Sequence, residues 1–121
     1  MATFEIPLYE TAEQELVDLH NRRPHWVDRL FMSRGADLAD PAPSAEIEAL
    51  GEGLGHRLAS LALVLRKVEA RGWTVELRGN DVRVATGLQT ESARRAMEDD
   101  GIWHIVQLLV GRRGADLFTY R

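Results

Sequence analysis

The chain of 121 residues contains no cysteine, which removes a whole group of chemistries at once. Without thiolates there are no thiol nucleophiles, no redox dithiols, no iron–sulfur ligation and no cysteine-ligated zinc. No disulfide framework of the kind that stabilises small secreted domains can form. No apolar run approaches the roughly 20 residues that a membrane-spanning helix needs, and the first residues do not resemble a signal peptide. We therefore expect a cytoplasmic protein with no membrane segment.

Lysine is almost absent, since Lys67 stands beside 14 arginines. This bias is typical of a GC-rich genome, and it also suits planar, bidentate recognition of anions. Charge is unevenly spread: residues 1–56 carry four basic and eleven acidic groups, whereas residues 57–121 carry eleven basic and eight acidic groups. Such a dipolar chain can pair its own halves, pair with a second copy or meet an anionic partner. The formal net charge of −4 disfavours nonspecific nucleic-acid binding.

The composition, 45% hydrophobic and 28% charged, is typical of one globular domain. We expect a single domain over residues 1–121. Its parts are an N-terminal arm and helix pair (1–35), a proline-containing connector (36–43), and a long helix followed by an α+β core (44–121).

Helical periodicity dominates the first 71 residues. Thr11 and Gln14 form a capping-box pattern that begins a helix, and Pro24 separates it from a second helix that stops at Gly35. The inner side of the first helix is predicted to carry Leu16, Val17, Leu19 and His20.

The strongest apolar stripe lies in residues 44–71, where several closely spaced glycines weaken the first part and leave a robust helix over residues 55–71. Apolar residues wrap beyond one stripe, which indicates burial on more than one side. The residues expected in the core or in an interface with a second copy are Leu54, Leu58, Leu61 and Leu65.

Alternation of polar and apolar residues predicts strands elsewhere. Residues 3–6, before Pro7, suit a short edge strand or an extended arm. Residues 73–86 form a hairpin around a Gly79–Asn80 turn, with Leu77 opposite Val82, Val75 opposite Val84 and Glu76 opposite Arg83.

A short helix over residues 90–100 is predicted next, with Ala93, Ala96 and Met97 inward. Residues 102–110 fit either a buried strand or a helix face. We favour a strand that turns through residues 111–114 into a last strand over 116–121. The expected architecture is an α+β fold, with N-terminal helices and one long central helix on a small antiparallel sheet and a hairpin–helix–hairpin C-terminal half.

Two arginine clusters are candidate binding sites, because arginine with an interleaved aromatic can bind phosphate and stack on a base. The first cluster comprises Arg22, Arg23, Arg29 and Trp26. The second, Arg112 and Arg113, occupies the predicted final hairpin turn. It is the better candidate, because a hairpin tip projects and is held by rigid strands.

Recognisable catalytic and cofactor motifs are missing. The four histidines, His20, His25, His56 and His104, show no metal-ligand spacing. Ser33 lacks the context of a nucleophile elbow, and the LGEGLG segment lacks that of a phosphate-binding loop. We therefore expect no metal, no cofactor and no catalytic residue.

Three hypotheses follow. The leading one is a small regulatory or adaptor module that acts through protein–protein interaction as a homodimer. The second is a small-ligand protein or minor enzyme that uses His56 or His104 with Glu52 and an arginine. The third is a nucleic-acid-associated protein that contacts phosphate through one arginine cluster.

Overall fold

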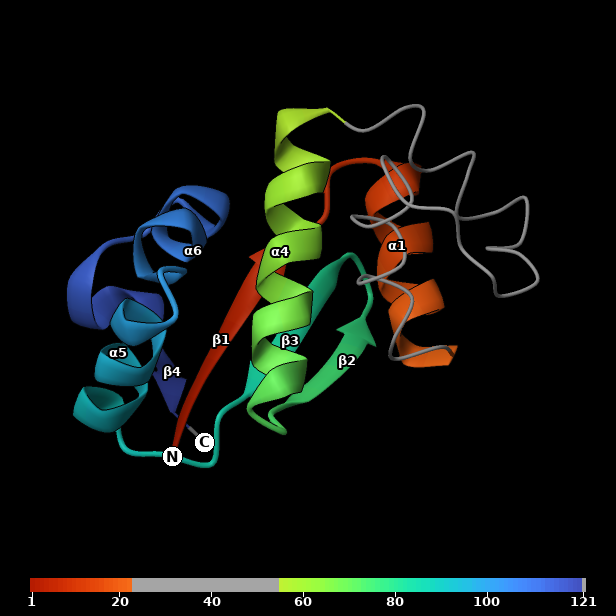
Figure 1. Ribbon diagram of the computed structural model, residues 1–121. Coiled ribbons are helices and arrows are strands. Elements are labelled where there is room, and N and C mark those ends of the chain that lie inside the picture. Colours follow the sequence, from red (N-terminus) through yellow and green to blue (C-terminus); the bar gives the residue numbers. More distant parts are fainter. Residues whose placement is uncertain (23–54, 121) are drawn as a thin grey trace, which may run out of the picture.

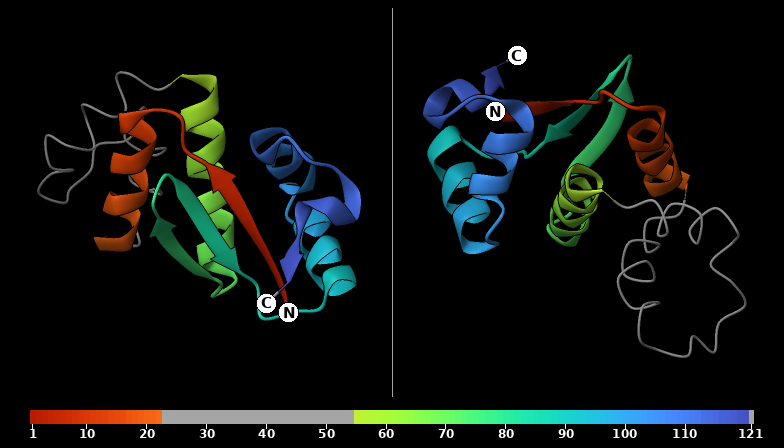
Figure 2. Two further views of the ribbon diagram at one scale, coloured as in Figure 1. Left: turned by 180° about the vertical axis from the view of Figure 1, so that it is seen from behind. Right: turned by 90° about the horizontal axis from the view of Figure 1, so that it is seen from above.

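The computed structural model describes residues 1–22 and 55–120, which build an antiparallel sheet with helices packed on one of its faces (Figures 1 and 2). The strands follow the order β2–β3–β1–β4, and their bounds are Ala2–Pro7 for β1, Thr74–Arg78 for β2, Asp81–Ala85 for β3 and Thr119–Tyr120 for β4. The helices are α1 (Thr11–Arg22), α4 (His56–Ala70), α5 (Thr90–Asp99), α6 (Trp103–Val110) and the short 3-10 helix η1 (Gly114–Leu117). The predicted α+β class is confirmed.

The first strand occupies an inner position, so the prediction of an edge strand or extended arm is wrong. β1 pairs antiparallel with β3 along its length, with Phe4 opposite Val84 and Ile6 opposite Val82. On its other side, Thr3 pairs with Thr119 of β4. Pro7 ends the strand, where its missing N–H costs the fewest ladder hydrogen bonds. Local alternation cannot reveal that the rest of the chain supplies a partner on each side.

The β2–β3 hairpin forms in the predicted register. Val75 lies opposite Val84, Glu76 opposite Arg83 and Leu77 opposite Val82. Gly79 has a φ of +59°, which a two-residue hairpin turn requires and glycine adopts without steric cost.

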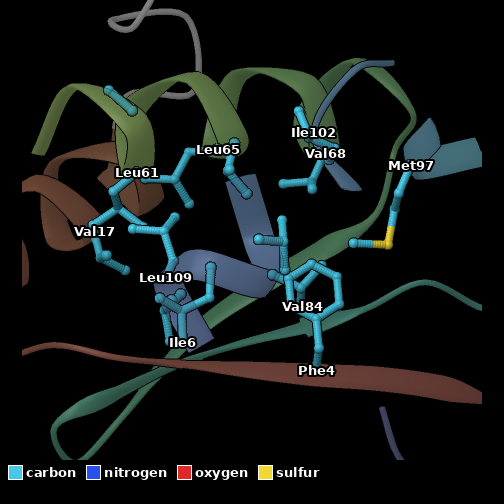
Figure 3. Close-up of a cluster of buried hydrophobic side chains, with 14 of the residues drawn as sticks. Phe4, Ile6, Val17, Leu61, Leu65, Val68, Val84, Met97, Ile102 and Leu109 are labelled. Atoms are coloured by element: carbon cyan, nitrogen blue, oxygen red, sulfur yellow. The ribbon is translucent and has the colours of Figure 1, made fainter. Parts of the chain in front are cut away.

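The long helix α4 crosses the middle of the sheet and supplies more of the core than any other described element (Figure 3). Leu61, Leu65 and Val68 point toward Phe4 and the neighbouring strand residues in that view. Leu58, Leu61 and Leu65 are all buried within the single chain, at 7, 1 and 0% exposed. Helix α1 and helix α6 also contact α4. The excess of apolar residues on this helix therefore has an explanation inside one copy of the chain.

The predicted inner faces of α1 and α5 are confirmed. The buried residues of α1 include Leu16, Val17, Leu19 and His20, and those of α5 are Ala93, Ala96 and Met97. The predicted capping box is not formed, because Thr11 already lies within α1 and the Gln14 N–H donates to the Glu10 carbonyl. The side-chain amide of Gln14 instead donates to Asn80 Oδ1 in the hairpin turn, at 2.9 Å. It thereby ties α1 to the sheet.

The C-terminal segment differs from its prediction. Residues 103–110 form helix α6 rather than a strand, and η1 and a two-residue β4 replace the last long strand. Ile102, Val106 and Leu109 are buried at helical spacing, whereas His104 and Leu108 are exposed. The helical alternative was the correct one, because tertiary contacts favour a helix that covers the β1–β4 side of the sheet.

A buried ion pair joins four elements near the end of β1. Arg57 Nε lies 2.7 Å from Glu13 Oε1, and the second carboxylate oxygen of Glu13 accepts the Tyr9 N–H at 3.1 Å. The guanidinium of Arg57 also donates to the carbonyls of Pro7 and Leu109. The pair therefore connects α1, β1, α4 and α6.

Three predicted segments lie outside the described residues: the helix that follows Pro24, the connector 36–43 and the weak start of the long helix. Within residues 1–22 and 55–120, no helix has the length and apolarity needed to cross a bilayer.

Candidate functional site

The segment with Arg112 and Arg113 links α6 to η1 and is not the hairpin tip that was predicted. Gly111 ends α6 with a φ of +78°, and Gly114 has a φ of +60°. The N–H of Gly114 donates to Gln107 Oε1 at 3.0 Å, which fixes the loop to the last turn of α6. The two exposed arginines therefore stand on a short, braced connection.

The open face of the sheet borders this loop. In Figure 2, seen from behind, the strands lie in front of α4, and no described helix covers them. Side chains at alternate positions of β1 and β3 point to this face, and they include Glu5, Asp81 and Arg83. The helix-bearing face of the same strands is apolar, so the sheet separates a packed side from a polar side.

Two depressions flank Arg112. The first, which we call the inner hollow, has a volume of about 220 Å³ and lies between the open sheet face and the end of α6. It is lined by Glu5, Pro7, Asp81, Val110, Arg112, Leu117 and Thr119.

The second depression, the outer hollow, is wider, with a volume of about 720 Å³. It is lined by Gly111, Arg112, Arg113, Ala115, Asp116 and Phe118. Phe118, which lines this hollow, is stacked on Trp103 with ring centroids 5.8 Å apart. Leu108 of α6, one turn before Arg112, is 62% exposed.

Four of the charged side chains around the two hollows have no ionic partner in the described part of the fold. Within the described residues, the side chains of Glu5, Asp81, Arg112 and Arg113 form no ion pair and no hydrogen bond. Other arginines in the described part of the chain are ion-paired to acidic side chains, among them Arg22, Arg57, Arg71, Arg78 and Arg94. Charges left without an internal partner remain available to a ligand.

The first arginine cluster is only partly described. Arg22 lies at the end of α1, where its Nε is 3.2 Å from Asp18 Oδ2 and both side chains are more than half exposed. Arg23, Trp26 and Arg29 lie outside the described residues, as does Leu54. The structure therefore gives no geometry for that cluster.

The histidines do not gather into a site among the described residues. His56 begins α4 and is exposed, and His104 is exposed on α6 rather than on the strand favoured for residues 102–110. His20 is buried in α1, and burial lowers its pKa below the ordinary value of 6.5. Residues 1–22 and 55–120 hold no group of three or more metal-ligating side chains. His25 and Glu52 are not among the described residues.

Glu5 and Asp81 were not singled out in the sequence. Each looks like the solvated position of an alternating strand, and only the pairing of β1 with β3 brings them together. Both residues fall on the polar positions of alternating strands, which suggests a shared polar face. Alternation does not indicate which strands are neighbours.

Comparison with known proteins gives no match: no family model, no curated protein and no solved structure is significantly similar to the chain. Functional argument therefore depends on the site itself.

Proposed function

We propose that the protein is a small regulatory or adaptor module that binds another protein through the Arg112–Arg113 loop and the outer hollow. The observation that carries the proposal is the pair of exposed arginines, unpaired within the described residues and fixed on a braced loop. We place this activity in the cytoplasm, because a cysteine-free chain uses none of the disulfides typical of small secreted domains.

The composition of the surface supports a protein partner. Arginine is enriched in protein interfaces and among the residues that dominate binding energy. Leu108 of α6, four residues before Arg112 in the chain, offers an exposed apolar side chain. The fitting partner presents acidic side chains around an apolar contact, because guanidinium groups pair with carboxylates in bidentate geometry.

A polyanionic nucleic acid fits less well. Glu5 and Asp81 lie beside Arg112 around the inner hollow, and their carboxylates repel phosphates. The formal net charge of −4 adds to this repulsion.

The sequence predicted a homodimer through the apolar face of the central helix. A homodimer would need a different surface. Leu58, Leu61 and Leu65 are buried within one chain and have little area left for a second copy.

The test is affinity capture with the full chain, followed by a binding titration with the purified captured protein. R112E/R113E is expected to weaken that interaction by more than about tenfold, with an unchanged melting temperature. R95E is the matched control, because Arg95 is exposed on α5 and forms no ion pair among the described residues.

Equal binding by R112E/R113E and the wild type would refute the proposed surface. A parallel loss of binding and melting temperature would do the same, because the arginines would then act through the fold. Selective capture of nucleic acid, removed by moderate salt, would favour the third hypothesis instead.

A further inference from the structure

The inner hollow combines an unusual set of charges in a small space. Two carboxylates, Glu5 and Asp81, and one guanidinium, Arg112, line it together. None of the three side chains has an ion-pair partner among residues 1–22 and 55–120. We propose that the inner hollow binds a free dibasic amino acid of the lysine type, a function separate from the protein partner proposed above.

The positions of the two carboxylates follow from the strand register. Asp81 lies opposite Pro7, and Glu5 is two residues before Pro7 on the same face of β1. Such diagonal neighbours on adjacent strands are roughly 7–8 Å apart. At that spacing, two cations joined by a short aliphatic chain can occupy one carboxylate each.

Arg112 adds one positive group to the two carboxylates, from the other side of the hollow. It follows the left-handed Gly111 at the end of α6, so it approaches from the helix layer rather than from the sheet. A guanidinium there suits a carboxylate through paired N–H donors. Among the residues that line the hollow, two negative groups and one positive group match a ligand with two ammonium groups and one carboxylate. Arg83 lies opposite Glu5 on the same face but is not part of this lining.

The remaining lining and the size fit the same ligand. Pro7, Val110 and Leu117 supply apolar contact for methylene groups, and Thr119 comes from β4. A volume of about 220 Å³ is smaller than the roughly 300–1,000 Å³ of pockets that hold drug-sized ligands. A free amino acid is of the right order.

Titration calorimetry with the full chain tests this inference with three probes. L-Lysine carries all three charges, cadaverine lacks the carboxylate, and norleucine lacks the side-chain ammonium. Wild-type protein is expected to bind L-lysine about tenfold or more tightly than either analogue, because each analogue leaves one charged group of the hollow unpaired.

The variants assign each contact. R112Q should remove the preference for L-lysine over cadaverine, since only the carboxylate contact is lost. E5Q and D81N should each lower the affinity for L-lysine by about tenfold. Neither should change the melting temperature measured by circular dichroism. E76Q is the control, because Glu76 lies on β2, outside the hollow, and pairs with Arg78 at 3.4 Å.

Several outcomes would overturn the inference. These are no heat with L-lysine up to about 10 mM, equal affinity for cadaverine and L-lysine, or equal weakening by E76Q and E5Q. Equal binding of α-N-acetyl-lysine amide would show that the hollow takes a lysine side chain of a partner protein instead. R113E separates the two proposals, because it should weaken binding of the protein partner and leave L-lysine binding unchanged.

Discussion

At the scale of single residues, the Glu13–Arg57 pair is the most buried ion pair among the described residues. The Glu13 side chain is only 3% exposed, and Arg57 also donates to the backbone carbonyls of Pro7 and Leu109. Removing one member of a buried pair leaves the other charge without compensation. We predict that R57A lowers the free energy of unfolding by about 3–5 kcal/mol, measured by urea denaturation.

The control for this prediction is R94A on α5. Arg94 pairs with Glu91 and Glu98, but all three side chains are more than a third exposed, and exposed pairs contribute little because water and salt screen them. The loss in R94A should be a small fraction of that in R57A. Equal losses would mean that burial of the Glu13 carboxylate is not what makes the Arg57 contact strong.

His20 makes stability depend on pH. Burial lowers its pKa in the folded state below 6.5, so the unfolded chain binds a proton more readily than the folded one. The free energy of unfolding should therefore decrease as pH falls below about 6.5 and level off below the folded-state pKa. Urea titrations between about pH 5 and about pH 8 check this expectation.

H20Q should flatten this part of the pH profile, and H104Q should leave it unchanged because His104 is exposed on α6. An NMR midpoint for His20 at or above 6.5 in the folded protein would contradict the assignment.

At the scale of elements, the sequence predicts best where a local pattern and a local turn agree. The β2–β3 register follows from alternation and from the Gly79–Asn80 turn, and both are local. Residues 102–110 lack that agreement, because a β-branched, apolar stretch of this length suits a strand and a helix equally. Gly101 follows the end of α5 and Gly111 follows the end of α6, with φ of +74° and +78°. A left-handed glycine after a helix is a common helix-ending signal, and Gly111 therefore pointed to a helix over these residues.

Gly111 ties the conformation of the arginine loop to the end of α6. A Cβ at this position meets nothing within 4 Å, so the cost of substitution is the left-handed backbone alone. We predict that G111A lowers the free energy of unfolding by about 1–2 kcal/mol and weakens binding at the loop. Asparagine tolerates this backbone better than alanine, so G111N should restore most of both losses. Similar destabilisation by G111N and G111A would show that backbone strain is not the cause.

At the scale of the whole molecule, strand order decides what the sequence can reveal about the candidate site. Arg112 and Arg113 stand out locally as adjacent arginines between two glycines. Glu5 and Asp81 come together only because β1 enters the sheet between β3 and β4. That insertion depends on long-range pairing between residues more than 70 positions apart, and no local pattern specifies it.

The same topology bears on whether one chain is a complete folding unit. Leu61 of α4 is 1% exposed and points into the cluster between the helix and the sheet (Figure 3). Replacing a buried leucine by alanine removes apolar contact and leaves a cavity, so L61A should lower the free energy of unfolding by about 2–5 kcal/mol. If the core belongs to one chain, the melting temperatures of wild type and L61A should both be independent of protein concentration over a range of about 1–100 μM, because only an obligate oligomer couples unfolding to concentration. A melting temperature that rises with concentration, and an L61A defect that shrinks with it, would instead mean that a second copy stabilises α4.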